Sequence, residues 1–258
     1  MPANNPSIFE GEGFDFAELR EYEYGDDVRK IDWNVTAKMQ KPYIRIFREE
    51  RELNIVIVAL LSGSLHFGSK RFKQEELAEI IALLGFSAVK NGDKFSLFTY
   101  DESLKSIIRS TKKVTAVNRG VEQVYQENCI GKRVNAKDLA KELFKKIKRR
   151  SIIFLVGDFF EEYDLRLLSK KHEVIAIMVR DKLEEHPPLL GSINLMDPSS
   201  LGSRYLDLNR TTKKEYEKQL QKRDHKLYLE LRRARVDFTK IYTDENPYIK
   251  LKKLFIKR

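Results

Sequence analysis

The sequence predicts an α/β fold with a doubly wound, mainly parallel sheet, preceded by an N-terminal extension. The runs at 54–61 and 151–156 are almost continuously apolar and β-branched, as central parallel strands covered on both faces require. Runs of this kind alternate with segments of helical periodicity, which favours right-handed crossovers. The 258 residues, 41% hydrophobic and 34% charged, fit one globular domain with an extension. We assign 1–52 to the extension and 53–258 to the domain.

The predicted elements follow the chain in a regular order. Strands are expected at 43–48, 54–61, 95–100, 104–108, 151–156, 173–179 and 236–242, the first of them as a half-buried edge strand. Helices are expected at 71–90, 114–125, 136–148, 211–234 and 247–256. The region 181–210 interrupts this alternation with Pro, Gly and Ser, and it carries two short strand candidates, at 193–195 and 204–208. We interpret it as an inserted loop or hairpin.

The segment 20–38, REYEYGDDVRKIDWNVTAK, contains the densest mixture of charged, aromatic and turn residues in the chain. Gly25, Asp26 and Asp27 have the composition of a turn that leads into a helix, because Asp side chains cap free helix amides. An apolar stripe at helical spacing follows, made of Val28, Ile31 and Val35. We expect Asp27, Arg29 and Asp32 to form a partly buried ion network over Trp33, the only tryptophan. The alternative is a helix cap with solvated ion pairs.

This segment resembles the signature of the bacterial "domain of unknown function 58" family, which carries a Gly-Asp-Asp-x-Arg-x-Ile-Asp-Trp core. The matching residues are Gly25, Asp26, Asp27, Arg29, Ile31, Asp32 and Trp33, with Arg20 and Tyr22 just before them. The likeness extends over nearly the whole chain, including 53–68, the Arg180–Asp181 region and the C-terminal end. It implies a von Willebrand factor A-like fold and an association with MoxR-type AAA+ ATPases. It implies no known reaction.

Von Willebrand A-type domains often bind a divalent ion through Asp-x-Ser-x-Ser after the first strand, a later Thr, and an Asp after the fourth strand. This chain has Leu60 in place of the first Asp but retains Ser62, Ser64 and Asp158, and offers only Asn135 or Lys137 for the Thr. A hard cation requires anionic oxygen ligands, so the loss of a carboxylate predicts a degenerate site with no metal and no other cofactor. We expect the serine loop to cap helix amides instead.

Composition excludes several other classes of protein. No apolar run approaches the length of a membrane span, and the N-terminus does not resemble a signal peptide, so a cytoplasmic location is expected. The single cysteine, Cys129, cannot form an internal disulfide. Neither a phosphate-binding Gly-rich motif nor a Gly-x-Ser-x-Gly nucleophile motif is found, so the chain is predicted not to be an enzyme.

Two alternatives remain open from the residues. Residues 211–258 hold 15 Lys or Arg and 7 Asp or Glu, a net charge of +8 within a total of +10. A non-specific nucleic-acid-binding protein could use these basic C-terminal helices, with Lys213, Lys214, Lys218, Lys222, Arg223 and Lys226 on the longest one. A metal-dependent hydrolase could instead use a carboxylate cluster of Asp26, Asp27 and Asp32.

The preferred hypothesis combines the fold with the family resemblance. It is a non-enzymatic binding or adaptor protein of a MoxR-type AAA+ ATPase system, which also engages other von Willebrand A-domain proteins and assists assembly or maturation of protein complexes or the envelope. The segment 20–33 is expected to be its interaction face or the direct support of that face.

Overall fold

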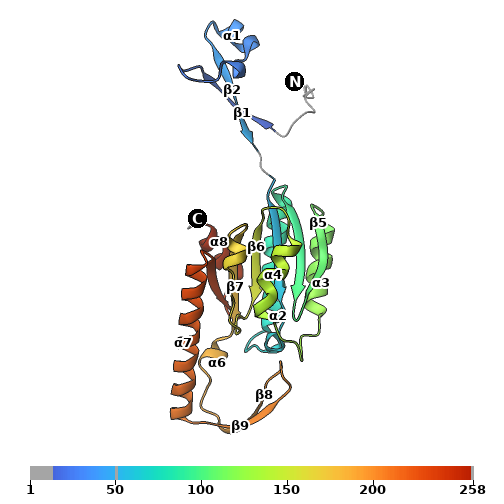
Figure 1. Cartoon of the computed structure of the whole chain (residues 1–258), viewed down its shortest axis with the longest axis vertical. Helices are drawn as coiled ribbons and strands as arrows, with labels where there is room; N and C mark the ends of the chain where they lie inside the picture. Colours follow the sequence, from blue (N-terminus) through green and yellow to red (C-terminus); the bar gives the residue numbers. More distant parts are fainter. Residues whose placement is uncertain (1–13, 50–51, 257–258) are drawn as a thin grey trace. The chain divides into compact units, whose positions relative to one another are not determined.

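The computed structural model describes residues 14–49 and 52–256. The chain divides into two compact units, Met1–Glu52 and Leu53–Arg258. Each is described by itself below, and Figure 1 labels their elements.

The first unit is built on a two-stranded antiparallel sheet. Strand β1 (Phe14–Glu21) pairs with β2 (Tyr43–Glu49), with an irregular register between Phe16 and Glu18. The strand predicted at 43–48 is therefore confirmed, but it pairs with β1, which the sequence did not predict, and not with the edge of the larger sheet. Between the two strands lie a 3₁₀ turn, η1 (Val28–Lys30), and a short helix, α1 (Trp33–Met39).

The segment after Asp27 is not the single helix that the stripe of Val28, Ile31 and Val35 predicts. Ile31 and Asp32 have extended backbone angles, and a β-bridge joins Ile31 to Ile44. Asp32 then begins α1 by accepting hydrogen bonds from the backbone of Asn34 and Val35. Two N-caps five residues apart, Asp27 and Asp32, divide the stripe into a turn and a helix.

The second unit contains a six-stranded sheet in the order β10-β7-β6-β3-β4-β5. Its strands are β3 (Asn54–Leu60), β4 (Lys94–Tyr100), β5 (Leu104–Thr111), β6 (Ile152–Gly157), β7 (Glu173–Arg180) and β10 (Asp237–Tyr242). All neighbours are parallel except β4 and β5, which are antiparallel. The predicted fold class is confirmed.

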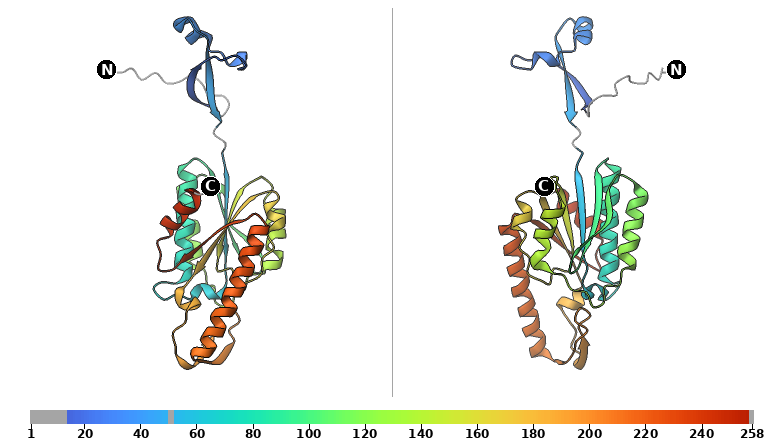
Figure 2. Two further views of the ribbon diagram at one scale, coloured as in Figure 1. Left: turned by 90° about the vertical axis from the view of Figure 1, so that its left-hand side faces the viewer. Right: turned by 45° about the vertical axis from the view of Figure 1, so that its right-hand side comes forward.

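Helices cover both faces of this sheet (Figure 2). They are α2 (Lys73–Lys90), α3 (Val114–Gln126), α4 (Ala136–Lys146), α5 (Arg166–Ser169), α6 (Lys182–Glu185), α7 (Arg210–Arg233) and α8 (Pro247–Ile256). Strand β3 shows why the sheet is doubly covered. Its Ile57 packs in a core cluster with residues of α2, α3 and α8, while Val58 packs in a second cluster with residues of α4 and α7. A nearly continuous apolar strand is what a sheet with two buried faces needs.

The inserted region forms a hairpin, β8 (Gly191–Met196) with β9 (Ser203–Leu208), at the carboxyl ends of the sheet strands (Figure 1). Its tip packs onto two loops of the domain. The backbone amide of Gly131 donates to the carbonyl of Pro198 over 2.8 Å. A Cβ on Gly63 would lie 2.2 Å from the same carbonyl oxygen, so the close approach requires glycine there.

Candidate functional site

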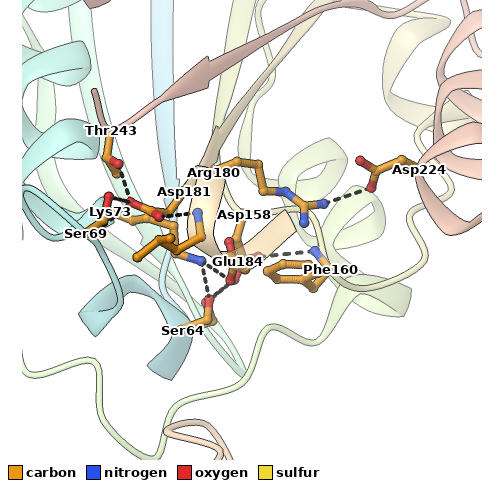
Figure 3. Close-up of polar contacts among 12 residues, drawn as sticks. Ser64, Ser69, Lys73, Asp158, Phe160, Arg180, Asp181, Glu184, Asp224 and Thr243 are labelled. Carbon is orange, nitrogen blue, oxygen red and sulfur yellow. Dashed lines mark hydrogen bonds and ion pairs between the residues drawn. The ribbon is translucent and has the colours of Figure 1, made fainter. Parts of the chain in front are cut away.

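The loops after β3 and β6 bring two serines against one buried carboxylate (Figure 3). Ser62 and Ser64 flank the start of the turn η2 (Gly63–His66), and Asp158 follows the last residue of β6. The hydroxyl of Ser62 donates to Asp158 Oδ2 over 2.6 Å, and the hydroxyl of Ser64 donates to the same oxygen. The expected helix-capping role of the loop is wrong, since Ser62 makes no side-chain cap hydrogen bond. The two serine hydroxyls instead donate hydrogen bonds to the Asp158 carboxylate.

The positive charge beside this carboxylate comes from Lys73, the first residue of α2. Its side chain is completely buried, which is rare for lysine. The Nζ atom donates to the Ser64 hydroxyl over 3.3 Å and to Glu184 Oε1 over 2.7 Å. The ammonium thus contacts one hydroxyl and one carboxylate directly, and its charge also acts on Asp158, which accepts from the same hydroxyl. Such oxygens are the ligands that a divalent cation would use. A fixed side-chain cation compensates the carboxylates of this site.

The pKa values of the two buried carboxyl groups, Asp158 and Glu184, are shifted in opposite directions. Burial alone would raise the pKa of Asp158, but the charge of Lys73 and the hydrogen bonds from Ser62 and Ser64 outweigh it and lower that pKa. Burial raises the pKa of Glu184, and the attraction of Lys73 only partly offsets the rise. Asp158 is therefore held as the anion that the ammonium requires.

A second buried cation adjoins this cluster. Arg180, the last residue of β7, is fully buried, donates to Asp224 over 3.1 Å and stacks on the ring of Phe160 at 3.7 Å. Arg223 also lies over that ring, at 4.4 Å. The aromatic ring thus interacts favourably with the buried guanidinium of Arg180 and with that of Arg223, which is exposed. Asp224 is shared with Lys240, so the network extends from β7 to α7 and β10.

Asp181 ties three elements together at the same edge. It is fully buried and accepts hydrogen bonds from the backbone and hydroxyl of Ser69, from the Thr243 hydroxyl and from the backbone of Leu183. Burial would raise the pKa of Asp181, but these donors outweigh it and lower the pKa. This carboxylate fixes the loop before α2, the end of β10 and the start of α6, and so positions Lys73 and Glu184 on either side of it.

The other residues at the expected divalent-ion positions, Leu60, Asn135 and Lys137, do not join the serines and Asp158. Leu60 is fully buried in the core at the end of β3. Its Cβ lies so close to Gly157 that a side chain at position 157 would clash with it. Asn135 donates to Asp138, and Lys137 is exposed. Within residues 14–49 and 52–256, no group of three His, Cys, Asp or Glu side chains is placed to hold a metal ion. The fit to a metal is poor, because Leu60 supplies no ligand and the Lys73 ammonium would repel a cation.

In the first unit, each of the three motif carboxylates has its own arginine. Arg20 binds both oxygens of Asp26 at 2.9 Å, Arg29 binds Asp27, which precedes it by two positions in the same turn, and Arg45 binds Asp32 over 2.7 Å. Hydrogen bonds from Arg29 and Arg45 lower the pKa of Asp27 and of Asp32, respectively. The predicted single network of Asp27, Arg29 and Asp32 is therefore wrong. The carboxylate cluster of the hydrolase alternative is not formed either, since separate ion pairs hold its members.

The other motif residues are mainly at the surface. Trp33 is 69% exposed and Arg29 is 87% exposed, so the expectation that Trp33 packs beneath the ions as an anchor is also wrong. Gly25 adopts a φ of +106°, which suits glycine in the turn. Tyr22 joins the strand end through its backbone amide, which donates to the carbonyl of Pro42, and Ile31 forms the bridge to Ile44.

Sequence reasoning missed Lys73, Glu184, Phe160 and the partner of Asp32, Arg45. Lys73 and Glu184 are 111 positions apart, so no local pattern connects them. One signal was present in the sequence. Asp158 is retained although the metal-binding pattern is lost, and a buried carboxylate without a metal ion requires another positive charge nearby. Arg45 could have been found from the alternation of its strand, which places it on the opposite face from the buried Ile44.

Among the helices that the structure describes, none has both the length and the apolar character needed to span a bilayer.

Solved structures with a similar fold include the conserved hypothetical protein BatB from Bacteroides thetaiotaomicron, with a TM-score of 0.49, 10% identity and coverage of 80% of this chain and 98% of that one. They also include the SpRpn10 VWA domain, with a TM-score of 0.40, 12% identity and coverage of 81% of this chain and 96% of that one.

Among curated proteins, the chain is similar to the uncharacterized protein Rv1480 of Mycobacterium tuberculosis and to Mb1516 of Mycobacterium bovis. It is 27% identical to each over 208 residues, which cover 75% of this chain and 63% of each relative. The chain thus spans less than two thirds of the length of these relatives. The family model described as "Protein of unknown function DUF58" matches residues 18–226. The chain belongs to the DUF58 family.

Proposed function

We propose that this chain is a non-enzymatic binding module that engages its partner without a divalent ion. The observation that carries the proposal is the Lys73 ammonium, buried among Ser64, Asp158 and Glu184 where a cation would otherwise be needed. In a metal-dependent binding site, an open coordination position accepts an oxygen from the partner. The ammonium has three donors and no such position.

The same geometry argues against nucleophilic chemistry at the serine loop. The hydroxyls of Ser62 and Ser64 both donate to Asp158, and Lys73 donates to Ser64. Lys73 is thus a hydrogen-bond donor to the serine and not the acceptor that a general base must be. A cluster in which the serine hydroxyls and the ammonium already bind one another and Asp158 supports a structural and binding role for this edge of the sheet.

The partner we propose is a MoxR-type AAA+ ATPase, and the cytoplasm is the proposed location. Membership of the DUF58 family and the resemblance through Gly25–Trp33 support this choice. In the same proposal the chain acts as an adaptor that also meets other von Willebrand A-domain proteins during assembly or maturation of complexes or of the envelope.

The test has two arms. Calorimetric titration of the purified chain with MnCl₂ is expected to show no specific site at micromolar concentration. The immobilised chain is expected to capture the MoxR-type ATPase of the same genome in MgATP. A one-to-one Mn²⁺ site that disappears in Asp158→Ala would overturn the metal-independent mechanism. Failure to capture the ATPase in its ATP, ADP and nucleotide-free states would overturn the choice of partner.

A further inference from the structure

The β8–β9 hairpin has one apolar face that the described part of the chain leaves largely open. In an antiparallel pair, directly opposite residues share a face. Ile193 lies opposite Leu206 and Leu195 opposite Arg204, so one face collects the aliphatic side chains. Leu195 is 44% and Leu206 is 47% exposed. A two-stranded sheet is only marginally stable by itself, and an amphipathic one normally buries its apolar face.

The edges of the hairpin are open as well. Within residues 14–49 and 52–256, β8 and β9 pair only with each other. Each outer edge therefore presents backbone N–H and C=O groups to which a further strand can bind. In many proteins, Lys or Pro in an edge strand blocks such pairing. Strand β8 (Gly191–Met196) contains neither residue.

The helix that follows the hairpin carries an unpaired basic stripe. Arg210, Lys214, Lys218 and Lys222 are spaced four residues apart, so they lie along one side of α7, and all four are exposed. Over the described residues none of them forms an ion pair, whereas Lys226 on the same helix pairs with Glu162. Like charges at this spacing weaken a helix, and an anionic partner would relieve their repulsion. Strand β9 leads through Asn209 into α7 and contacts it, so the stripe begins at the end of the hairpin.

We propose that the hairpin and the basic stripe form one docking surface for an acidic, extended segment of a partner protein. The segment adds a third strand to a free edge of the hairpin. Its alternate apolar side chains pack beside Leu195 and Leu206 and extend their face, and its carboxylates interact with the stripe of Lys214 and Lys218. Backbone pairing supplies affinity and the charges supply selectivity.

Three other occupants fit less well. Inside a bilayer the open strand edges would leave backbone groups unsatisfied. Nucleic acid would use the lysines, but the aliphatic face offers no stacking platform, since the one aromatic residue, Tyr205, is on the opposite face with Met196 and Asn194. A second copy of this chain would bring like charge against the stripe.

The surface lies at the carboxyl edge of the sheet, where ligands bind in open α/β folds. The hairpin tip packs on Gly63 and Gly131, next to the serine loop. The inference deepens the proposed function. It rests on that proposal only in taking the partner to be a protein.

The test uses the full chain and a fluorescein-labelled peptide of alternating Glu and Val, followed by fluorescence anisotropy at low salt. Binding should slow amide hydrogen exchange in Gly191–Leu208. Leu195→Asn with Leu206→Asn, and separately Lys214→Glu with Lys218→Glu, are each expected to weaken binding by about tenfold or more. The matched control is Lys145→Glu with Lys146→Glu on α4, which makes the same charge change at another exposed basic site and should leave affinity within about twofold.

Several outcomes would overturn the inference. One is equal binding of a Lys/Val peptide, which would remove the charge argument. Another is stronger, hairpin-dependent binding of phosphatidylglycerol vesicles or of a single-stranded oligonucleotide, which would assign the surface to a different class of ligand. Absence of peptide binding by the wild type also sinks it. Peptide binding without ATPase capture would leave the docking surface standing and refute the proposed partner. ATPase capture together with peptide binding that neither the Leu195/Leu206 nor the Lys214/Lys218 variant weakens would leave the partner standing and refute the docking surface.

Discussion

The two charge-rich regions of the molecule differ in how they hold their ions. In the first unit, three arginines pair with the three carboxylates of the motif, and each of these arginines is partly or largely exposed, Arg29 by 87%. At the carboxyl edge of the large sheet, Lys73 and Arg180 are completely buried. Exposed pairs contribute little to stability, whereas a buried cation without its partner is very costly. Density of charge in the sequence marks the first region, but burial of charge marks the second as the structural centre.

The largest effect is expected from removing the buried ammonium. Lys73→Ala leaves Asp158 and Glu184 without compensation and should cost about 3–5 kcal/mol of the free energy of unfolding. The Glu184 carboxylate and the Ser64 hydroxyl then lose their cation beside the Asp158 carboxylate, so a divalent ion that replaces the ammonium should restore part of the lost stability when MnCl₂ is added. Urea unfolding with and without Mn²⁺ measures both effects.

Lys70→Ala is the control for this substitution, because Lys70 is exposed and only three positions earlier. It should unfold like the wild type at either metal concentration. Wild-type stability of Lys73→Ala would show that the two regions do not differ in the way described.

A smaller effect is expected from pH. The folded-state pKa of Asp158 is lowered from 3.8, so its contribution to stability is complete above pH 3.8 and is lost as the pH falls through the folded value. Each pH unit between the two pKa values corresponds to about 1.4 kcal/mol. Below pH 3.8 the wild type should therefore lose stability more steeply than Asp158→Asn.

Urea unfolding curves recorded at successive pH values compare the two proteins. Glu184 has a raised pKa and is protonated in both states well below 4.5, so it does not interfere in that range. Parallel pH profiles would show that the Asp158 carboxylate is not held by Lys73 and the serines.

In the motif segment, Asp32 is expected to matter locally. Asp32→Ala removes the cap of α1 and the partner of Arg45, so amides of α1 should exchange faster, on the order of tenfold. Asp32→Asn retains a good cap without the charge and should show an intermediate rate. Equal exchange rates in all three proteins would mean that the cap does not hold the helix.

The smallest effect is expected for Arg29→Ala. Its side chain is exposed and, among the residues that the structure describes, pairs only with Asp27 in the same turn, so the urea midpoint and the exchange rates of α1 should not change measurably. The informative measurement is ATPase capture. If capture is lost while folding is unchanged, the exposed face of this segment is an interface; if unfolding shifts as far as in Lys73→Ala, the contrast between the regions is wrong.

The fold was largely predictable because its signals are local. Apolar runs such as Asn54–Leu60 and Ile152–Gly157 identify buried strands without knowledge of their neighbours. Strand β1 was missed because Phe14–Glu21 mixes acidic and apolar residues and its partner β2 lies beyond the motif. The stripe through Val28 and Ile31 satisfied helical spacing, but the cap at Asp32 and the bridge to Ile44 prevailed over periodicity.

The candidate site was predictable only in part. Ser62, Ser64 and Asp158 follow strands whose carboxyl ends meet, so their proximity follows from topology. The burial of Lys73 does not, because lysine at the start of a helix is ordinarily solvated and the ion pair with Glu184 depends on tertiary structure.

The buried ammonium also changes how the domain responds to its surroundings. A bound ion exchanges with solvent, so a metal-dependent domain is loaded according to the supply of that ion and can be emptied by a chelator. Lys73 is covalently part of the chain, so its charge is present in every folded molecule at unit stoichiometry. The domain is therefore constitutively loaded, and control over the binding that we propose has to come from the partner, from its abundance, or from surfaces away from this cluster.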